Sequence, residues 1–204
     1  MIRLPRLYAI LDASNYLSDD DLYTAASEFV AAGVTLIQYR NKAGDARQML
    51  DHGRGLKLRI GSSVKLIMND RADLCIAADF DGVHVGQDDL SPAGARKVIG
   101  DKFCLGVSTH NDGQVRAADL TSADYIAVGP VFGTSSKQNP DPVIGLEGVR
   151  SARALTKKPL VAIGGITLEN CRSVIEAGAD CVAVISALTA NPQRSARSFL
   201  SALK

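Results

Sequence analysis

The sequence predicts a single (β/α)8 barrel, and three observations support this fold class. Eight short apolar runs recur along the 204 residues, at intervals of about 25 residues. Several are apolar at nearly every position, as expected for strands of a parallel sheet that is covered on both faces. Stretches with helical patterning separate them, which is the order of alternating βα units. An open doubly wound sheet is the alternative, but a closed barrel uses all eight units and leaves little sequence over.

The elements follow one another regularly. The helix after the first strand is predicted to begin at Ser18, an N-cap followed by acidic residues, and to end at Gly33. The helix after the seventh strand opens with the capping-box pair Thr167 and Asn170 and closes at Gly178. The predicted strands are, in order, "LYAIL" 7–11, "VTLIQY" 34–39, "VKLIM" 64–68, "GVHV" 82–85, "FCLGV" 103–107, "YIAV" 125–128, "LVAI" 160–163 and "CVAVI" 181–185.

One connection is much longer than the others. Residues 129–145, "GPVFGTSSKQNPDPVIG", follow the sixth strand and are rich in Gly, Pro, Asn and Ser. Long connections of this kind in a compact domain commonly carry function. We therefore predict one barrel domain over residues 1–204 with a mobile lid at about 129–145.

Composition excludes several classes of protein. The 23 basic and 22 acidic residues are interspersed, so we expect no nucleic-acid partner and no membrane surface. The N-terminus lacks a signal-peptide pattern and no apolar run is long enough to cross a bilayer, which predicts a cytoplasmic protein. The sequence leaves a homo-oligomer open. Four cysteines without CxxC spacing are predicted to be buried, reduced and chemically silent: Cys75, Cys104, Cys171 and Cys181.

Polar residues follow seven of the eight predicted strands, whereas the strands themselves are almost free of charge. In a barrel, the carboxyl ends of the strands build the active site. The stretch "VTLIQYRNK" at 34–42 ends in Gln38, Arg40 and Lys42, which project to the same side of an extended backbone. Two cations at one strand end predict an anionic ligand.

A second anion site is predicted after the last two strands. Gly164 and Gly165 leave their backbone N–H groups unobstructed just before a predicted helix, and Ser186 follows the eighth strand. Many barrels hold a phosphate between these two loops. A plain tight turn that requires glycine is the alternative. Two separate anion sites would suit two phosphorylated ligands.

Asp70 and Asp89 are carboxylates at the ends of neighbouring strands, a donor set that suits Mg²⁺ completed by phosphate and water. The alternative for Asp70 is that it caps the next helix and pairs with Arg71. Asp88 and Asp89 are adjacent and point to opposite sides, so at most one of them faces the metal.

The three histidines receive different predictions. His84 lies within an apolar strand and is predicted to be a packed, hydrogen-bonded core residue. His52 is predicted to be a solvated helix residue. His110 follows the fifth strand and either reaches the pocket or begins the next helix.

A series of motifs identifies a family. In order, and spread over about residues 7 to 188, the chain contains "QYRNK", "NDRADL", "GVHVGQDD", "GVSTH", "GPVFGTSSK", "GLEGV", "AIGGI" and "VISAL". This series resembles the thiamine-phosphate synthase family. The resemblance implies a barrel enzyme that joins 4-amino-5-hydroxymethyl-2-methylpyrimidine diphosphate to a thiazole phosphate. The products would be thiamine monophosphate and pyrophosphate.

The resemblance also implies site residues, each at the position that matches the family motif. The Mg²⁺ ligands fall on Asp70 and Asp89, and catalytic roles fall on Arg40, Lys42, Ser108 and Lys137. The contacts to the pyrimidine diphosphate fall on Gln38, Tyr39, Arg40, Asn41, Lys42, Asn69, Ser108 and Lys137. The contacts to the thiazole phosphate fall on Thr134, Ser135, Ser136, Gly165, Ile185 and Ser186.

Two departures and two alternatives accompany the resemblance. Ser136 stands where the family usually has Thr, and Gly133 replaces a frequent Pro, changes that keep the donors but loosen the lid. A thiazole tautomerase on the same scaffold would need no metal diphosphate and could use His110 as a base. Asp89 and Lys137 favour the synthase, because a metal-free isomerisation would require neither residue. A phosphate-ligand sensor without turnover is the non-enzymatic alternative.

Overall fold

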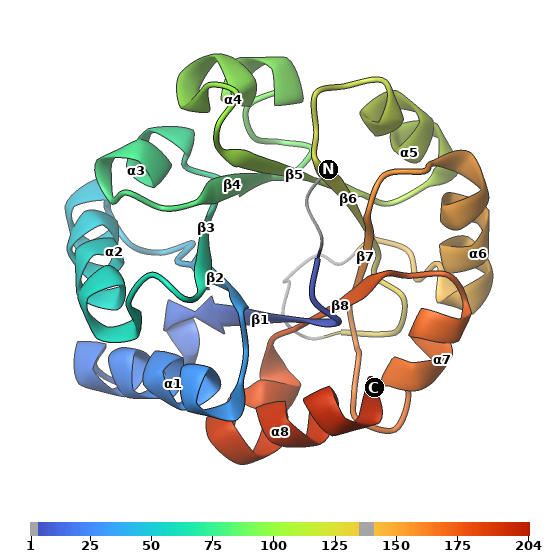
Figure 1. Ribbon diagram of the computed structural model, residues 1–204. Coiled ribbons are helices and arrows are strands. Elements are labelled where there is room, and N and C mark those ends of the chain that lie inside the picture. Colours follow the sequence, from blue (N-terminus) through green and yellow to red (C-terminus); the bar gives the residue numbers. More distant parts are fainter. Residues whose placement is uncertain (1–3, 135–140) are drawn as a thin grey trace.

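The closed barrel is the arrangement observed in the computed structural model, which describes residues 4–134 and 141–204. Eight parallel strands pair in sequence order, and β1 closes on β8 with Ala9 opposite Val184 (Figure 1). This pairing confirms the barrel and excludes the open sheet. The strands are β1 Leu7–Asp12, β2 Leu36–Arg40, β3 Lys65–Asn69, β4 Gly82–Val85, β5 Cys104–Thr109, β6 Tyr125–Val128, β7 Leu160–Ile163 and β8 Cys181–Val184.

The helices form a ring around the barrel (Figure 1). Within the described ranges, none of them is long and apolar enough to cross a membrane. They are α1 Asp19–Ala32, α2 Ala46–Ile60, α3 Ala72–Ala77, α4 Pro92–Ile99, α5 Asp112–Asp119, α6 Gly145–Leu155, α7 Cys171–Glu176 and α8 Pro192–Ala202, with short 3-10 helices η1 Ala13–Asn15 and η2 Ser186–Leu188.

Helix α1 has the ends that were predicted, but α7 does not begin where expected. Ser18 caps α1, and Gly33 ends it with a φ of 98°. In α7 only half of the capping box forms, since the Asn170 side chain accepts from the Thr167 backbone N–H at 2.8 Å. The same side chain donates to the Gly165 carbonyl at 3.0 Å. Residues 168–170 form a turn next to these bonds, and the helix starts at Cys171.

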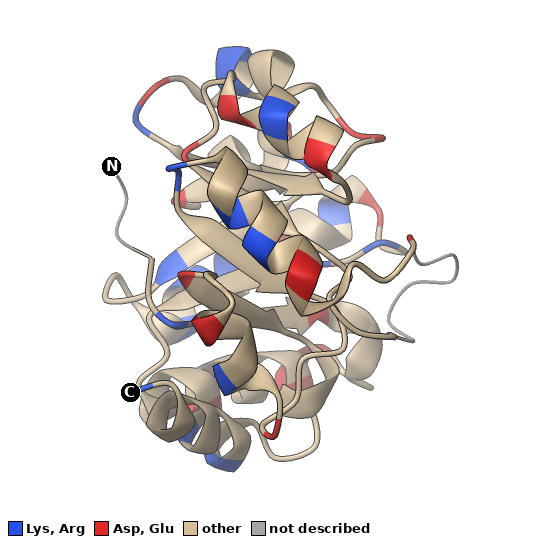
Figure 2. Ribbon diagram, turned by 90° about the vertical axis from the view of Figure 1, so that its right-hand side faces the viewer, with Lys and Arg blue, Asp and Glu red and all other residues tan. Residues whose placement is uncertain are grey.

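Strand side chains alternate between two cores, which explains why the strands are apolar at nearly every position. Leu7 and Leu11 pack outward against the helices, whereas Tyr8 and Ile10 point into the barrel. The outer surface is mixed in charge, with basic and acidic residues interspersed over the helices and loops (Figure 2). The inner core consists of Tyr8, Ile10, Leu36, Ile67, Tyr125, Ala127, Val161, Cys181 and Ala183.

The four cysteines are free thiols, as predicted. Three are fully buried, and Cys104 is half-buried against the inner core. Burial raises the pKa of the Cys75 and Cys104 thiols to about 12. Both therefore stay protonated at neutral pH and are poor nucleophiles.

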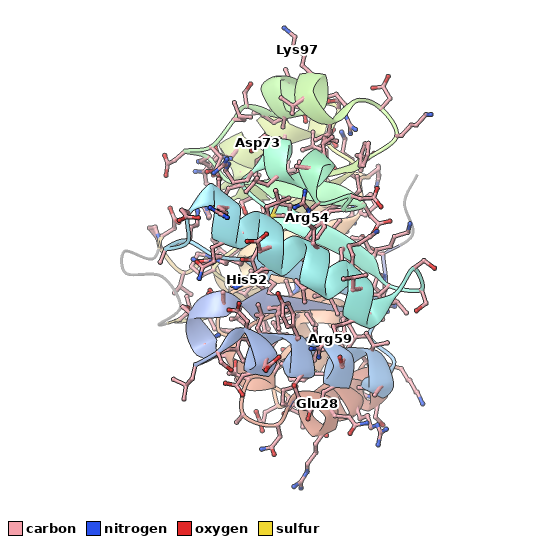
Figure 3. The ribbon with its side chains drawn as sticks, turned by 90° about the vertical axis from the view of Figure 1, so that its left-hand side faces the viewer. Glu28, His52, Arg54, Arg59, Asp73 and Lys97 are labelled. Carbon is pink, nitrogen blue, oxygen red and sulfur yellow. The ribbon has the colours of Figure 1, made fainter. Side chains whose placement is uncertain are left out.

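His52 corrects the sequence-based prediction, because it is 4% exposed rather than solvated. It lies between α1 and α2 (Figure 3). Its Nε2 donates to the Asp19 carboxylate at 2.8 Å, and its Nδ1 lies 2.8 Å from the Tyr39 hydroxyl. The side chain therefore ties β2 to two helices, a set of contacts that helix periodicity alone does not reveal.

We expect His52→Ala to lower the free energy of unfolding by about 2 kcal/mol, because the Tyr39 hydroxyl loses its buried partner. Urea denaturation would measure the change. The matched control is Arg54→Ala, an exposed position on the same helix (Figure 3), for which a change below about 0.5 kcal/mol is expected. Equal effects of the two variants would contradict a structural role for the buried histidine.

Candidate active site

A pocket of about 1140 Å³ opens at the carboxyl ends of the strands. All eight strands or the loops after them contribute to its wall. This is the end of the barrel where the parallel topology places the site. The rim predicted from the sequence is therefore a real concave surface.

Most of the predicted site residues meet in this pocket. Ser135, Ser136 and Lys137 lie outside the described residues. The predicted residues that line the pocket are Gln38, Arg40, Lys42, Asn69, Asp70, Asp89, Ser108, Thr134, Gly165, Ile185 and Ser186.

Tyr39 and Asn41 do not line the pocket, and their contacts with the substrate stay predictions. Tyr39 alternates with its inward-facing neighbours on β2, so its ring is buried on the outer side with its hydroxyl 2.8 Å from His52. Asn41 accepts from the backbone N–H of Gly44 at 2.8 Å and so fixes the loop before α2. Both support the strand that carries Arg40 rather than forming the pocket wall.

The predicted cations are already paired with carboxylates. Arg40 forms a salt bridge with Asp12, the last residue of β1, and Lys42 forms one with Asp70. Asp12 was not predicted, because the apolar run at 7–11 ends one residue before it. The feature of the sequence that could have indicated Asp12 is a carboxylate directly after an apolar run. Each pair holds its cation in place while reducing the charge that a ligand meets.

Asp70 and Asp89 share one part of the pocket. The Asp89 carboxylate accepts from the Gly86 backbone N–H at 2.7 Å. Burial, followed by a hydrogen bond to Asp89, raises the pKa of Asp70 to about 6 despite the opposing effect of Lys42. The helix-capping alternative fails, since Arg71 pairs with Asp73 and α3 has no side-chain cap. Two carboxylates this close to each other fit a divalent cation.

The described pocket wall contains more carboxylates than lysine and arginine side chains. Its cations are Arg40 and Lys42, and its carboxylates are Asp70, Asp88, Asp89 and Asp141. A polyphosphate would meet net repulsion from these side chains unless further positive charge were supplied. A cation between two of the carboxylates would supply that charge. The carboxylates are therefore consistent with a ligand that is a metal diphosphate, and not with an anion that binds without a metal.

On the opposite side of the pocket, backbone groups rather than charged side chains are available to a ligand. Gly164 and Gly165 have φ values of 101° and 61°, which favour glycine. A Cβ added at Gly165 would lie 2.4 Å from the Gly133 carbonyl oxygen, so the close approach also requires glycine. The helix start that lines the pocket is that of η2 at Ser186, and this short helix was not predicted. Loops after β7 and β8 with a short extra helix are a frequent phosphate site in barrels.

The described ends of the predicted lid are anchored. The backbone N–H groups of Val131 and Phe132 donate to the carbonyls of Ile163 and Gly164 at 2.9 and 3.0 Å. Thr134 and, beyond the undescribed residues, Asp141 both line the pocket. The mobility of this segment stays a prediction, while its two described ends lie at the pocket mouth.

Both remaining histidines line the pocket. His84 is 8% exposed and hydrogen-bonded through both ring nitrogens, which confirms the packed role predicted for it. His110 lies with Nδ1 2.6 Å from the Gly129 carbonyl, to which it donates, and with Nε2 3.4 Å from Asp141. His110 thus bridges the fifth strand end and both ends of the predicted lid.

Comparisons with known proteins agree with one another. A family model described as thiamine monophosphate synthase matches residues 7–188. A thiamine-phosphate synthase from Koribacter versatilis is 58% identical over 99% of this chain and 97% of its own length. One from Chloroflexus aurantiacus is 45% identical over 91% of this chain and 85% of its own length.

A solved structure agrees with the sequence comparisons. A thiamine phosphate pyrophosphorylase from Pyrococcus furiosus superposes with a TM-score of 0.86 at 30% identity, covering 97% of this chain and 95% of that one. The barrel, the rim pocket and these matches over nearly the whole length lead to one conclusion: the chain belongs to the thiamine monophosphate synthase family.

Proposed function

We propose that the rim pocket joins 4-amino-5-hydroxymethyl-2-methylpyrimidine diphosphate to a thiazole phosphate, releasing pyrophosphate and forming thiamine monophosphate. This is the activity of a thiamine-phosphate synthase, a transferase, and family membership supports it. The observation that carries the proposal is the facing pair Asp70 and Asp89 beside Lys42, across the pocket from the bare backbone at Gly165. The proposed setting is the cytoplasm, with two small molecules as partners.

The chemistry places modest demands on the protein. The amino group of the pyrimidine donates electron density to the methylene carbon while its bond to the diphosphate oxygen breaks, and the thiazole nitrogen then attacks that carbon. Asp70 and Asp89 would hold Mg²⁺, which supplies positive charge next to the leaving diphosphate. Arg40, Lys42 and Lys137 are proposed to add charge, and Ser108 a hydroxyl donor. Gln38 and Asn69 would place the pyrimidine ring.

The second substrate is assigned to the glycine side. Gly165, Ile185 and Ser186 are proposed to hold the thiazole phosphate through backbone N–H groups and the serine hydroxyl. Thr134, Ser135 and Ser136 would complete this subsite from the connecting segment. Holding the two rings together converts an encounter of two substrates into a reaction within one complex.

We expect Ser186→Ala to raise the apparent KM for the thiazole phosphate about tenfold, because a hydrogen bond to a charged oxygen is lost. The KM for the pyrimidine diphosphate should change by less than about twofold. Steady-state kinetics with one substrate varied at a time would measure both values. An equal rise for the two substrates would contradict this division of the pocket.

One assay tests the function directly. Both phosphorylated substrates are incubated with the protein and Mg²⁺, and thiamine monophosphate and pyrophosphate are measured with and without a chelator. We expect equal amounts of the two products, and loss of both with the chelator. Aromatisation of the thiazole phosphate without pyrophosphate release would indicate the tautomerase instead. Ligand binding that ignores the chelator, with no turnover, would indicate a sensor.

A further inference from the structure

A chain of hydrogen bonds crosses the interior of the barrel and begins and ends at the pocket. Gln38 Nε2 donates to the Tyr8 hydroxyl at 2.9 Å, and that hydroxyl lies 3.1 Å from the hydroxyl of Tyr125. The Tyr125 hydroxyl lies 2.9 Å from His84 Nδ1, and His84 Nε2 lies 2.8 Å from Ser108 Oγ. We call these five residues the relay. They come from five different strands.

Either hydroxyl can donate in the contact between Tyr8 and Tyr125, but one direction gives every proton of the relay an acceptor. The Tyr8 hydroxyl accepts from Gln38, and in this direction its own proton goes to Tyr125. Tyr125 accepts from Tyr8 and gives its own proton to His84 Nδ1. A neutral imidazole that accepts at Nδ1 carries its proton on Nε2, which donates to Ser108. The Ser108 hydroxyl proton is then left to point at a ligand.

The two tyrosines are held as neutral hydroxyls. Tyr8 and Tyr125 are 1% and 0% exposed, and burial raises the pKa of both hydroxyls well above the usual value of 10.0. Each tyrosine therefore keeps its proton. It can accept one hydrogen bond and donate the next without changing charge.

A glycine makes room for the middle of the relay. A Cβ added at Gly106 would lie 2.3 Å from the Tyr125 hydroxyl oxygen and 2.5 Å from His84 Nδ1. The rings of Tyr125 and His84 stack with centroids 5.5 Å apart and an interplanar angle of 24°. The backbone of β5 is thus shaped to bring these two groups into hydrogen-bond contact.

We propose that Tyr125 is a positioning residue, which acts through His84 to fix the Ser108 hydroxyl as a donor toward the leaving diphosphate. A diphosphate presents only acceptor oxygens, so it matches Ser108 in that orientation and not in the reverse one. At the other end of the relay, the Gln38 amide oxygen remains to accept from the amino group of the pyrimidine. The identity of the ligand in this inference rests on the proposed function.

The tautomer of His84 tests the direction without any turnover. The chain has three histidines, so a two-bond ¹H–¹⁵N spectrum contains three imidazole patterns. The pattern that is lost in His84→Gln belongs to His84. We expect the Nε2–H tautomer in the unaltered protein and a mixture of the two tautomers in Tyr125→Phe. An Nδ1–H tautomer or a charged imidazole at His84 in the unaltered protein would overturn the proposal, even if Tyr125→Phe does not fold.

Kinetics test whether Tyr125 acts through Ser108. We expect Tyr125→Phe and Ser108→Ala each to lower kcat about tenfold, and the double variant to lose no more than Ser108→Ala alone. The control is Thr109→Val, which removes a buried hydroxyl that donates to the Ala127 carbonyl, and its kcat should stay within about threefold. Multiplicative losses in the double variant would show independent roles and contradict the relay.

The two tests separate failure of the inference from failure of the proposed function. If the unaltered protein made no thiamine monophosphate, the activity would be wrong, and the tautomer would still decide the direction of the relay. If the synthase activity were present but His84 carried its proton on Nδ1, the function would stand and the relay would be wrong.

Discussion

Asp89→Asn is expected to lower kcat/KM for the pyrimidine diphosphate about 10²-fold at ordinary Mg²⁺ concentrations, the usual loss for one preorganised electrostatic group. The described pocket wall carries four carboxylates against one lysine and one arginine, so we expect productive binding of a diphosphate to depend on a cation held there. Asparagine removes one negative charge and one anionic ligand from the pair with Asp70. Added Mg²⁺ should recover part of the activity, because the lost affinity is for the metal.

Titration of activity with Mg²⁺ would measure this effect, together with thermal unfolding to check the fold. A rim side chain contributes little to core packing, so Tm should change by no more than a few degrees. The matched control is Asp88→Asn, which makes the same change of charge at the exposed neighbouring residue. Full activity of Asp89→Asn with an unchanged Mg²⁺ requirement would remove Asp89 from the metal site.

The strands were predictable because each is buried on both sides. The run at 160–163 is observed as β7 at the same residues, and that at 125–128 as β6. An apolar side chain at every position indicates that the strand packs against two cores, one inside the barrel and one beneath the helices. The Asp70 and Asp89 pair was predictable for a related reason. Parallel strands place their carboxyl ends at one rim. Residues that follow consecutive strands are therefore expected to lie close together.

What the sequence did not reveal depends on pairings between distant residues. Asp12 and Arg40 are 28 residues apart, and their salt bridge depends on the register of β1 against β2. Tyr8 and Tyr125 are 117 residues apart and meet only because the barrel closes. His52 shows the same limit, since a position on a charged helix became buried through a neighbouring helix and a strand. Local patterns predict which face a residue takes, but not its partner on that face.

Lys137→Ala is expected to lower kcat by about 10²–10³, with a much smaller change in the KM for the diphosphate. The two described cations of the pocket are paired with Asp12 and Asp70. We therefore expect a further cation beside the metal where negative charge grows on the leaving group. Lys137 lies outside the described residues, but it follows Thr134, a pocket residue, by three positions, so we expect its ammonium to reach the diphosphate.

We expect the effect in kcat because the lid is predicted to close over bound substrates, and Lys137 would then meet the diphosphate oxygens as their charge increases. Its interaction is then stronger in the transition state than in the bound substrate. Lys137→Arg should recover part of the rate by restoring the charge, whereas Lys102→Ala, an exposed position before β5, should leave kcat unchanged. Steady-state kinetics at saturating substrates and Mg²⁺ decide the matter. With chemistry rate-limiting, a kcat for Lys137→Ala within about threefold of the unaltered protein would mean that this lysine takes no part in pyrophosphate departure.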